Sequence, residues 1–104
     1  MDSYISSILE NNKVVVFSKS WCPYWRNVIS LLNNALIENE VIDLETHPDG
    51  YTISQELSAK IGTTLVPQVF IGGELVGGCD ETISAASDGS LASLLNKYEV
   101  SHDL

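Results

Sequence analysis

One cysteine stands where a run of strand-type residues gives way to an amphipathic helical pattern. The strand-type run is Val14 to Phe17, and the helical pattern extends from Cys22 to about Ile37. Because proline is well tolerated in the first turn of a helix, Pro23 places Cys22 at the helix N-terminus, beside unpaired backbone N–H groups and the positive end of the helix dipole. These surroundings favour the thiolate, which is the nucleophilic form. We therefore predict that Cys22 is a reactive thiol.

The residue three positions after Cys22 is unusual for a redox motif. Motifs of the C-x-x-C type carry a second thiol there, on the same helical face, whereas this chain has Trp25. Trp25 continues an apolar stripe that includes Val28, Leu32 and Leu36, so we expect it to pack inward and to hinder access to the thiol. An indole at this position could alternatively offer a stacking surface to a different partner.

Basic residues are concentrated around this thiol in an otherwise acidic chain. Fourteen acidic and five basic residues give a formal charge of −9, which argues against nucleic acid or an anionic membrane as partner. Between Asn11 and Ile37, Lys13, Lys19 and Arg26 contribute +3 without any acid, which leaves −12 for the remainder. This pattern indicates a site that stabilises a thiolate and an anionic ligand, although a chance placement of a few lysines is the simpler alternative.

Length and composition predict one domain over residues 1–104, with enough apolar residues, 44%, to form a core without disulfides. The chain lacks signal-peptide features and any apolar run of membrane-spanning length, so we expect a cytoplasmic monomer with no membrane association. Two cysteines are too few for a secreted disulfide scaffold. His47 and His102 have no metal-ligand spacing with other residues, and we expect no bound metal.

Hydrophobic periodicity predicts alternating helices and strands. Helices are expected near residues 4–9, 22–37, 53–61 and 80–98, the last broken at Asp88-Gly89, and strands at 14–17, 41–44, 66–71 and 74–76. The first two strands, joined by a helix, should be parallel, whereas Gly72-Gly73 predicts an antiparallel hairpin. The expected α/β fold is a four-stranded mixed sheet flanked by helices on both faces.

Three local patterns, in their order and spacing, resemble the glutaredoxin family. They are Trp21-Cys22-Pro23-Tyr24, Val66-Pro67 at the start of a strand, and Gly77-Gly78-Cys79-Asp80 at a strand-to-helix turn. The resemblance covers essentially the whole chain and implies a thioredoxin-like fold. It also implies that Cys22 is the nucleophile, faced by Pro67 in a cis peptide bond, and that glutathione is the co-substrate. The implied glutathione-binding residues are Lys19, Tyr24, Val66, Pro67, Gly78, Cys79 and Asp80, with Arg26 and Trp25 modifying the site.

Three departures from the family pattern affect these expectations. Leu65 stands where the family commonly has threonine, and Thr63-Thr64 stand where it has a long polar or basic residue, so we expect weakened glutathione affinity. Trp25 removes the second thiol, which prevents a dithiol cycle. Cys79 is a conceivable substitute, but its position in the ligand turn favours a spectator or side-disulfide role.

Together these features predict a glutathione-dependent thiol–disulfide oxidoreductase acting in electron transport and cell redox homeostasis. By a monothiol mechanism it would deglutathionylate proteins and reduce small mixed disulfides. One alternative is a non-catalytic module that binds glutathione, or a [2Fe–2S] cluster bridged between two subunits by Cys22 and glutathione; Pro23 and Trp25 disfavour the cluster because they crowd the thiol. A second alternative is an impaired or engineered glutaredoxin.

Overall fold

The computed structural model describes residues 4–19, 25–63 and 65–104, so Cys22 and Tyr24 lie outside the described residues, as does the side chain of Trp25. The element order matches the predicted one. The elements are α1 (Tyr4–Asn11), β1 (Val14–Ser18), α2 (Trp25–Asn34), β2 (Glu40–Asp43), α3 (Gly50–Ile61), β3 (Gln68–Ile71), β4 (Glu74–Gly77), α4 (Cys79–Asp88) and α5 (Ser90–Lys97).

The four strands form one mixed sheet in the order β2-β1-β3-β4. β1 is parallel to β2 and antiparallel to β3, and β3 is antiparallel to β4, as predicted. Gly72 and Gly73, which join β3 to β4, both have positive φ angles, 59° and 84°. Glycine adopts this backbone region without steric penalty, so the pair permits the tight connection between the strands.

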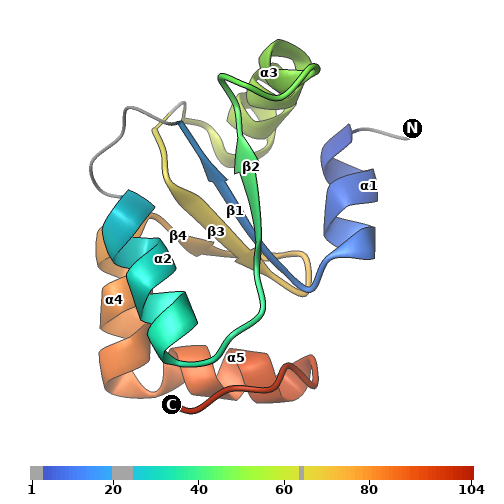
Figure 1. The fold of residues 1–104 in the computed structure, drawn as a ribbon. Helices are drawn as coiled ribbons and strands as arrows, with labels where there is room; N and C mark the ends of the chain where they lie inside the picture. Colours follow the sequence, from blue (N-terminus) through green and yellow to red (C-terminus); the bar gives the residue numbers. More distant parts are fainter. Residues whose placement is uncertain (1–3, 20–24, 64) are drawn as a thin grey trace.

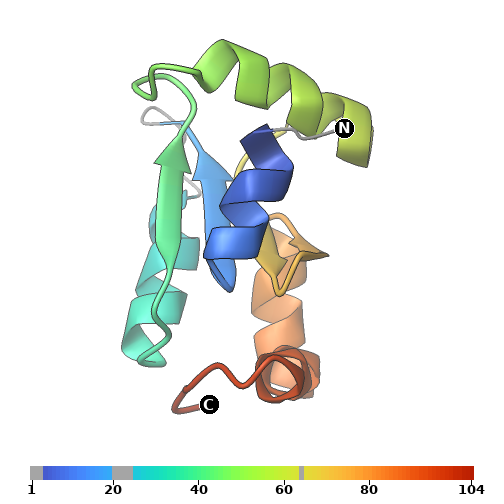
Figure 2. The same cartoon turned by 90° about the vertical axis from the view of Figure 1, so that its right-hand side faces the viewer.

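Two hydrophobic clusters lie on opposite faces of the sheet, because successive strand residues point to alternate sides. Val14, Val16, Val69 and Ile71 pack with α2 and α5, and the half-buried side of α4 joins them. On the other face, Val15, Phe17, Ile42 and Phe70 pack with α1 and α3. Figure 1 shows the sheet between these two groups of helices. Figure 2 shows α3 across the end of the sheet where β1 finishes, and α5 near the opposite end.

Several element boundaries differ from the prediction by one to three residues, and two of these differences have a clear cause in the backbone. The strand expected to begin at Val66 begins at Gln68, because Pro67 has no N–H to donate to a ladder and the pairing with β1 starts at Phe17 and Gln68. The helix expected to reach Ile37 ends at Asn34. Leu36 takes a left-handed conformation, with φ of 58°, and Ile37 N–H donates to the Leu32 carbonyl at 2.9 Å, which closes the helix end. Leu36 is therefore exposed and not part of the buried stripe.

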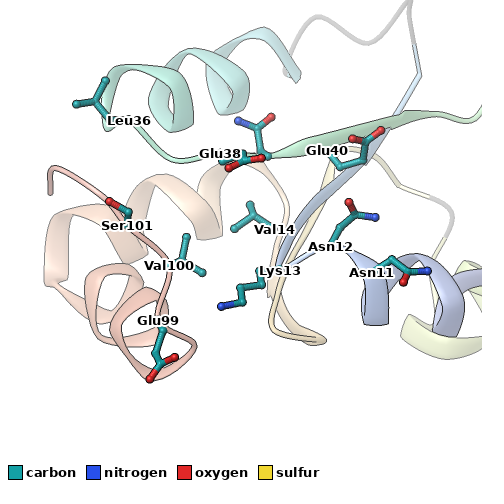
Figure 3. A pocket seen from close by; sticks show the side chains of 11 residues that line it. Asn11, Asn12, Lys13, Val14, Leu36, Glu38, Glu40, Glu99, Val100 and Ser101 are labelled. Carbon is teal, nitrogen blue, oxygen red and sulfur yellow. The ribbon is translucent and has the colours of Figure 1, made fainter.

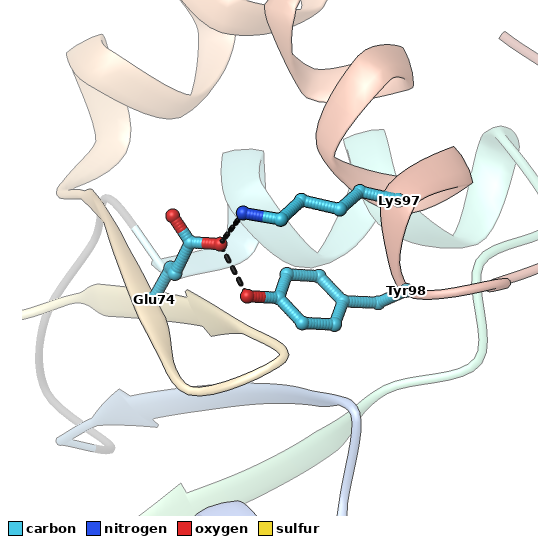
Figure 4. Close-up of polar contacts among 3 residues, drawn as sticks. All are labelled: Glu74, Lys97 and Tyr98. Carbon is cyan, nitrogen blue, oxygen red and sulfur yellow. Dashed lines mark hydrogen bonds and ion pairs between the residues drawn. The ribbon is translucent and has the colours of Figure 1, made fainter.

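A polar cluster ties the β3–β4 hairpin to the end of α5 (Figure 4). Lys97 Nζ lies 2.9 Å from Glu74 Oε2, and the Tyr98 hydroxyl donates to the same oxygen. The hydrogen bond from Tyr98, followed by that from Lys97, holds the pKa of Glu74 below its ordinary value. The same hydrogen bonds to the carboxylate raise the pKa of Lys97 and of Tyr98.

Within the described residues, no helix combines the length and apolar character needed to cross a membrane.

Candidate functional site

The strand register places three of the predicted site segments at one edge of the sheet. Phe17 near the end of β1 pairs with Gln68 at the start of β3, and Val69 pairs with Gly77 at the end of β4. The residues that follow β1, precede β3 and follow β4 must therefore emerge side by side. This arrangement brings the neighbourhoods of Lys19, Pro67 and Gly78 together although they are far apart in the sequence.

The loop before β3 is held in a defined conformation at this edge. The Val66–Pro67 peptide bond is cis, as the resemblance implies, with Pro67 buried and Val66 half-buried. Gln68 is only 7% exposed, and its Nε2 donates to the Leu65 carbonyl at 2.9 Å. The N–H of Leu65 donates to Thr63 Oγ1 at 3.1 Å. Side chains on both sides of Leu65 thus fix its backbone.

The Gly77-Gly78 turn packs directly against this loop. A Cβ atom on Gly78 would lie 3.2 Å from the carbonyl oxygen of Pro67, so any larger residue would press on the cis-proline loop. Gly77 has φ of 130°, and a Cβ there would come within 2.6 Å of Glu81 Cβ. Gly77 is therefore restricted to glycine by both its backbone angle and its surroundings. The turn and the proline loop are therefore neighbours in the structure.

The turn leads into α4, whose first N–H groups have no acceptor within the helix. One such donor is already used by the chain itself, because Gly78 N–H donates to Glu81 Oε1 at 2.9 Å. Since glycine has no side chain, only the glutamate half of a capping box is made. Glu81 was not among the predicted site residues, although the Gly78-x-x-Glu81 spacing is a signal for this contact. An incoming carboxylate would compete with Glu81 for the turn.

For the remaining predicted site residues, the structure gives the element and the exposure of each residue. Lys19 is half-buried directly after β1. The last residue of β1 accepts a 2.8 Å hydrogen bond at its carbonyl, that of Ser18, from the N–H of Leu44, which follows β2. Arg26 is exposed in the first turn of α2, and Asp80 is exposed in that of α4. Cys79 is half-buried and packs against the cluster that contains α2 and α5.

A cavity of about 520 Å³ lies at the opposite end of β1, away from these residues (Figure 3). Lys13, Leu36 and Glu99 are among the residues that line it, and none of the predicted site residues that the structure describes does. The described part of the candidate site is therefore an edge of the sheet built from loop backbone and a helix N-terminus, and this cavity does not belong to it.

Within the part of the chain that the structure describes, no three His, Cys, Asp or Glu side chains gather as metal ligands would.

Comparison with known proteins gives consistent matches. The family model for glutaredoxin matches residues 14–76. Glutaredoxin-C8 of Oryza sativa subsp. japonica is 39% identical over 104 residues, covering 98% of this chain and 76% of that protein. The crystal structure of wheat glutaredoxin superimposes with a TM-score of 0.83 and 39% identity, covering 89% of each chain. The buckwheat glutaredoxin–glutathione complex gives a TM-score of 0.81 and 33% identity, covering 89% of this chain and 87% of that one. With this fold, site geometry and family match, the chain belongs to the glutaredoxin family.

Proposed function

We propose that this glutaredoxin reduces protein–glutathione mixed disulfides by a monothiol mechanism. The Cys22 thiolate attacks the glutathione sulfur of the mixed disulfide, forming a new S–S bond while the old one breaks, and the protein thiolate leaves and takes a proton from water. A second glutathione thiolate then attacks the glutathione sulfur bound to Cys22, which releases the Cys22 thiolate and glutathione disulfide. The protein substrate is reduced and glutathione is oxidised, so the electrons balance without a further reductant.

The observation that carries this proposal is the meeting of the cis-proline loop and the Gly77-Gly78 turn beside the N-terminus of α4. The residue before a proline favours an extended backbone, with which a tripeptide can pair, and a carboxylate is stabilised at a helix N-terminus. Glutathione offers both groups. A buckwheat relative with 33% identity has been solved as a glutathione complex, which supports the same ligand for this chain.

Trp25 decides how the cycle ends. With a tryptophan at the position of the second thiol, Cys22 has no partner three residues away for an intramolecular disulfide. The second half-reaction therefore depends on external glutathione. We expect the indole to slow the approach of glutathione to the thiol, so that the rate is lower than with a smaller residue at this position.

The test is the removal of glutathione from a glutathionylated model peptide, followed in wild type, Cys22→Ser and Cys79→Ser. We expect Cys22→Ser to lose the activity, because it removes the nucleophile, and Cys79→Ser to keep most of it, because serine retains the backbone N–H that the turn offers to a ligand. Equal rates for wild type and Cys22→Ser would refute the proposal. Trp25→Cys should add reduction of protein disulfides in a dithiol cycle, and a lack of that gain would show that more than the second thiol is missing.

A further inference from the structure

We propose that Leu65 determines substrate specificity by contacting the protein half of the mixed disulfide. Substrates with a large apolar side chain next to the glutathionylated cysteine would then be preferred. This inference rests on the proposed function, and it concerns the half of the substrate that varies from one protein to another.

Leu65 combines a fixed backbone with a solvent-exposed side chain. Its side chain is 73% exposed, while its N–H is bonded to Thr63 and its carbonyl to Gln68. Two hydrogen bonds thus hold the residue that lies two positions before Pro67, at the sheet edge described above. An apolar side chain held in this way can lose water contact on binding without ordering its own backbone, which makes burial more favourable.

The chemistry of Leu65 suits the protein half of the substrate better than glutathione. Glutathione is a polar tripeptide with two carboxylates and one amine, and it has no large apolar side chain. Leucine offers it neither charge nor a hydrogen bond. The polar groups that suit the carboxylates of glutathione belong instead to the α4 N-terminus and to the basic residues Lys19 and Arg26. The apolar surface of Leu65 is therefore left for the other half of the disulfide.

A single exposed leucine is common on protein surfaces, so the experiment must separate a contact from mere exposure. Leu36 provides a matched control, because it is 70% exposed but lies beside the cavity at the opposite end of β1. Leu65→Ala and Leu36→Ala remove the same atoms from equally open positions. Leu65→Thr is a second variant with a polar, β-branched side chain.

The measurement is kcat/KM for glutathionylated peptides of one sequence that differ only in the residue beside the cysteine, which is Ala, Leu or Phe. We expect wild type to prefer Leu and Phe over Ala by about threefold to tenfold, where tenfold corresponds to about 1.4 kcal/mol. Leu65→Ala and Leu65→Thr should bring this ratio close to one. Leu36→Ala should leave it unchanged.

The outcomes distinguish the two proposals. If wild type turns over none of the peptides, both the proposed function and the role of Leu65 fail. If wild type is active but shows no preference, or keeps its preference in both Leu65 variants, the role of Leu65 is refuted and the proposed function stands. If Leu65→Ala changes the KM for glutathione and leaves the peptide ratio as in wild type, Leu65 contacts glutathione, and the inference is likewise overturned.

Discussion

A single carboxylate competes for the donors that the Gly77-Gly78 turn offers to a ligand. Glu81 Oε1 accepts the Gly78 N–H at 2.9 Å, at the helix end where an anionic ligand is stabilised. We expect a ligand carboxylate that uses this donor to approach against the charge of Glu81 and to displace its hydrogen bond. Glu81 would then stabilise the start of α4 while it opposes ligand binding.

Glu81→Gln is predicted to lower the KM for glutathione by about twofold to fivefold, because a helix-terminal charge is worth about 0.4–1 kcal/mol. Glutamine can keep the cap, so stability should change little. Glu81→Ala removes the cap as well and should cost about 0.5–1 kcal/mol of stability, by analogy with the loss of other helix caps. Steady-state kinetics and urea unfolding measure the two effects. A higher KM in Glu81→Gln would show that Glu81 assists ligand binding.

The sequence predicts best those site residues whose role depends on the backbone. Pro67 and Gly78 belong to motifs with local conformational requirements, and in the structure Pro67 follows a cis bond and Gly78 packs against it. Gln68 and Glu81 were not predicted, because their contacts depend on where a flexible side chain turns. The polar Gln68 within an apolar strand run was a signal, but its bond to the Leu65 carbonyl could not be read from spacing alone.

Among the elements, the β3–β4 hairpin depends on close packing at Gly72. A Cβ atom there would lie 2.3 Å from the Tyr98 ring, whereas nothing lies within 4 Å of a Cβ on Gly73. Both glycines have positive φ angles. Gly73→Ala should lower the free energy of unfolding by about 1 kcal/mol, the backbone penalty alone. Gly72→Ala adds a steric clash to this penalty and should therefore lower it by about 2–4 kcal/mol. Denaturant unfolding of the two variants measures this difference. Equal losses of unfolding free energy in both variants would exclude a clash with Tyr98.

The Glu74–Lys97–Tyr98 cluster joins the same hairpin to α5 and should make this link pH-dependent. The pKa of Glu74 is lowered from 4.5, so its contribution to stability is present above pH 4.5 and is lost as the pH falls through the lowered folded pKa. The pKa of Tyr98 is raised from 10.0, so its contribution is present below pH 10.0 and is lost as the pH rises through the raised folded value.

Tyr98→Phe should therefore lower the Tm between about pH 4.5 and 10, the window set by these two shifts, with the difference shrinking at both extremes. Thermal unfolding followed by circular dichroism across this range measures it. Tyr51→Phe is the control, because it removes a hydroxyl that is bonded to the neutral side chain of Gln55. A Tyr98→Phe difference that persists unchanged well below pH 4.5 would mean that the Glu74 carboxylate is not its source.

Element order and type could be predicted from periodicity, whereas several boundaries could not, and two of them show why. The pattern of apolar residues continues through Leu36, but the helix closes at Asn34 with Leu36 in a left-handed conformation. In the sequence, an apolar residue at the position that ends a helix cannot be distinguished from a further residue of the helix's apolar stripe. Similarly, Val66 is strand-like in type, but Pro67 delays the ladder until Gln68. In both cases the backbone hydrogen bonds, and not side-chain hydrophobicity, decide where the element ends.

At the scale of the whole molecule, charged residues affect binding over two distances, close to the site and over the approach of a protein substrate. Lys19 follows β1 and Arg26 lies in the first turn of α2, and we expect both to stabilise an anionic ligand at short distance. The formal charge of −9 sets the field felt by an approaching protein, because acidic residues dominate the rest of the chain. At about 0.1 M salt, this field is screened beyond roughly 10 Å. The small ligand and the protein substrate should therefore respond differently to ionic strength.

We predict that, at low ionic strength, a glutathionylated peptide with several lysines is reduced about threefold to tenfold faster, as kcat/KM, than the same peptide with glutamates in their place. Added salt should slow the basic peptide, speed the acidic one and leave a neutral peptide nearly unchanged. The reason is that the net negative field attracts the first and repels the second before either contacts the site. Initial rates across a salt series measure this. A preference for the acidic peptide at low salt would mean that the bases around the site, and not the net charge, govern encounter with the protein substrate.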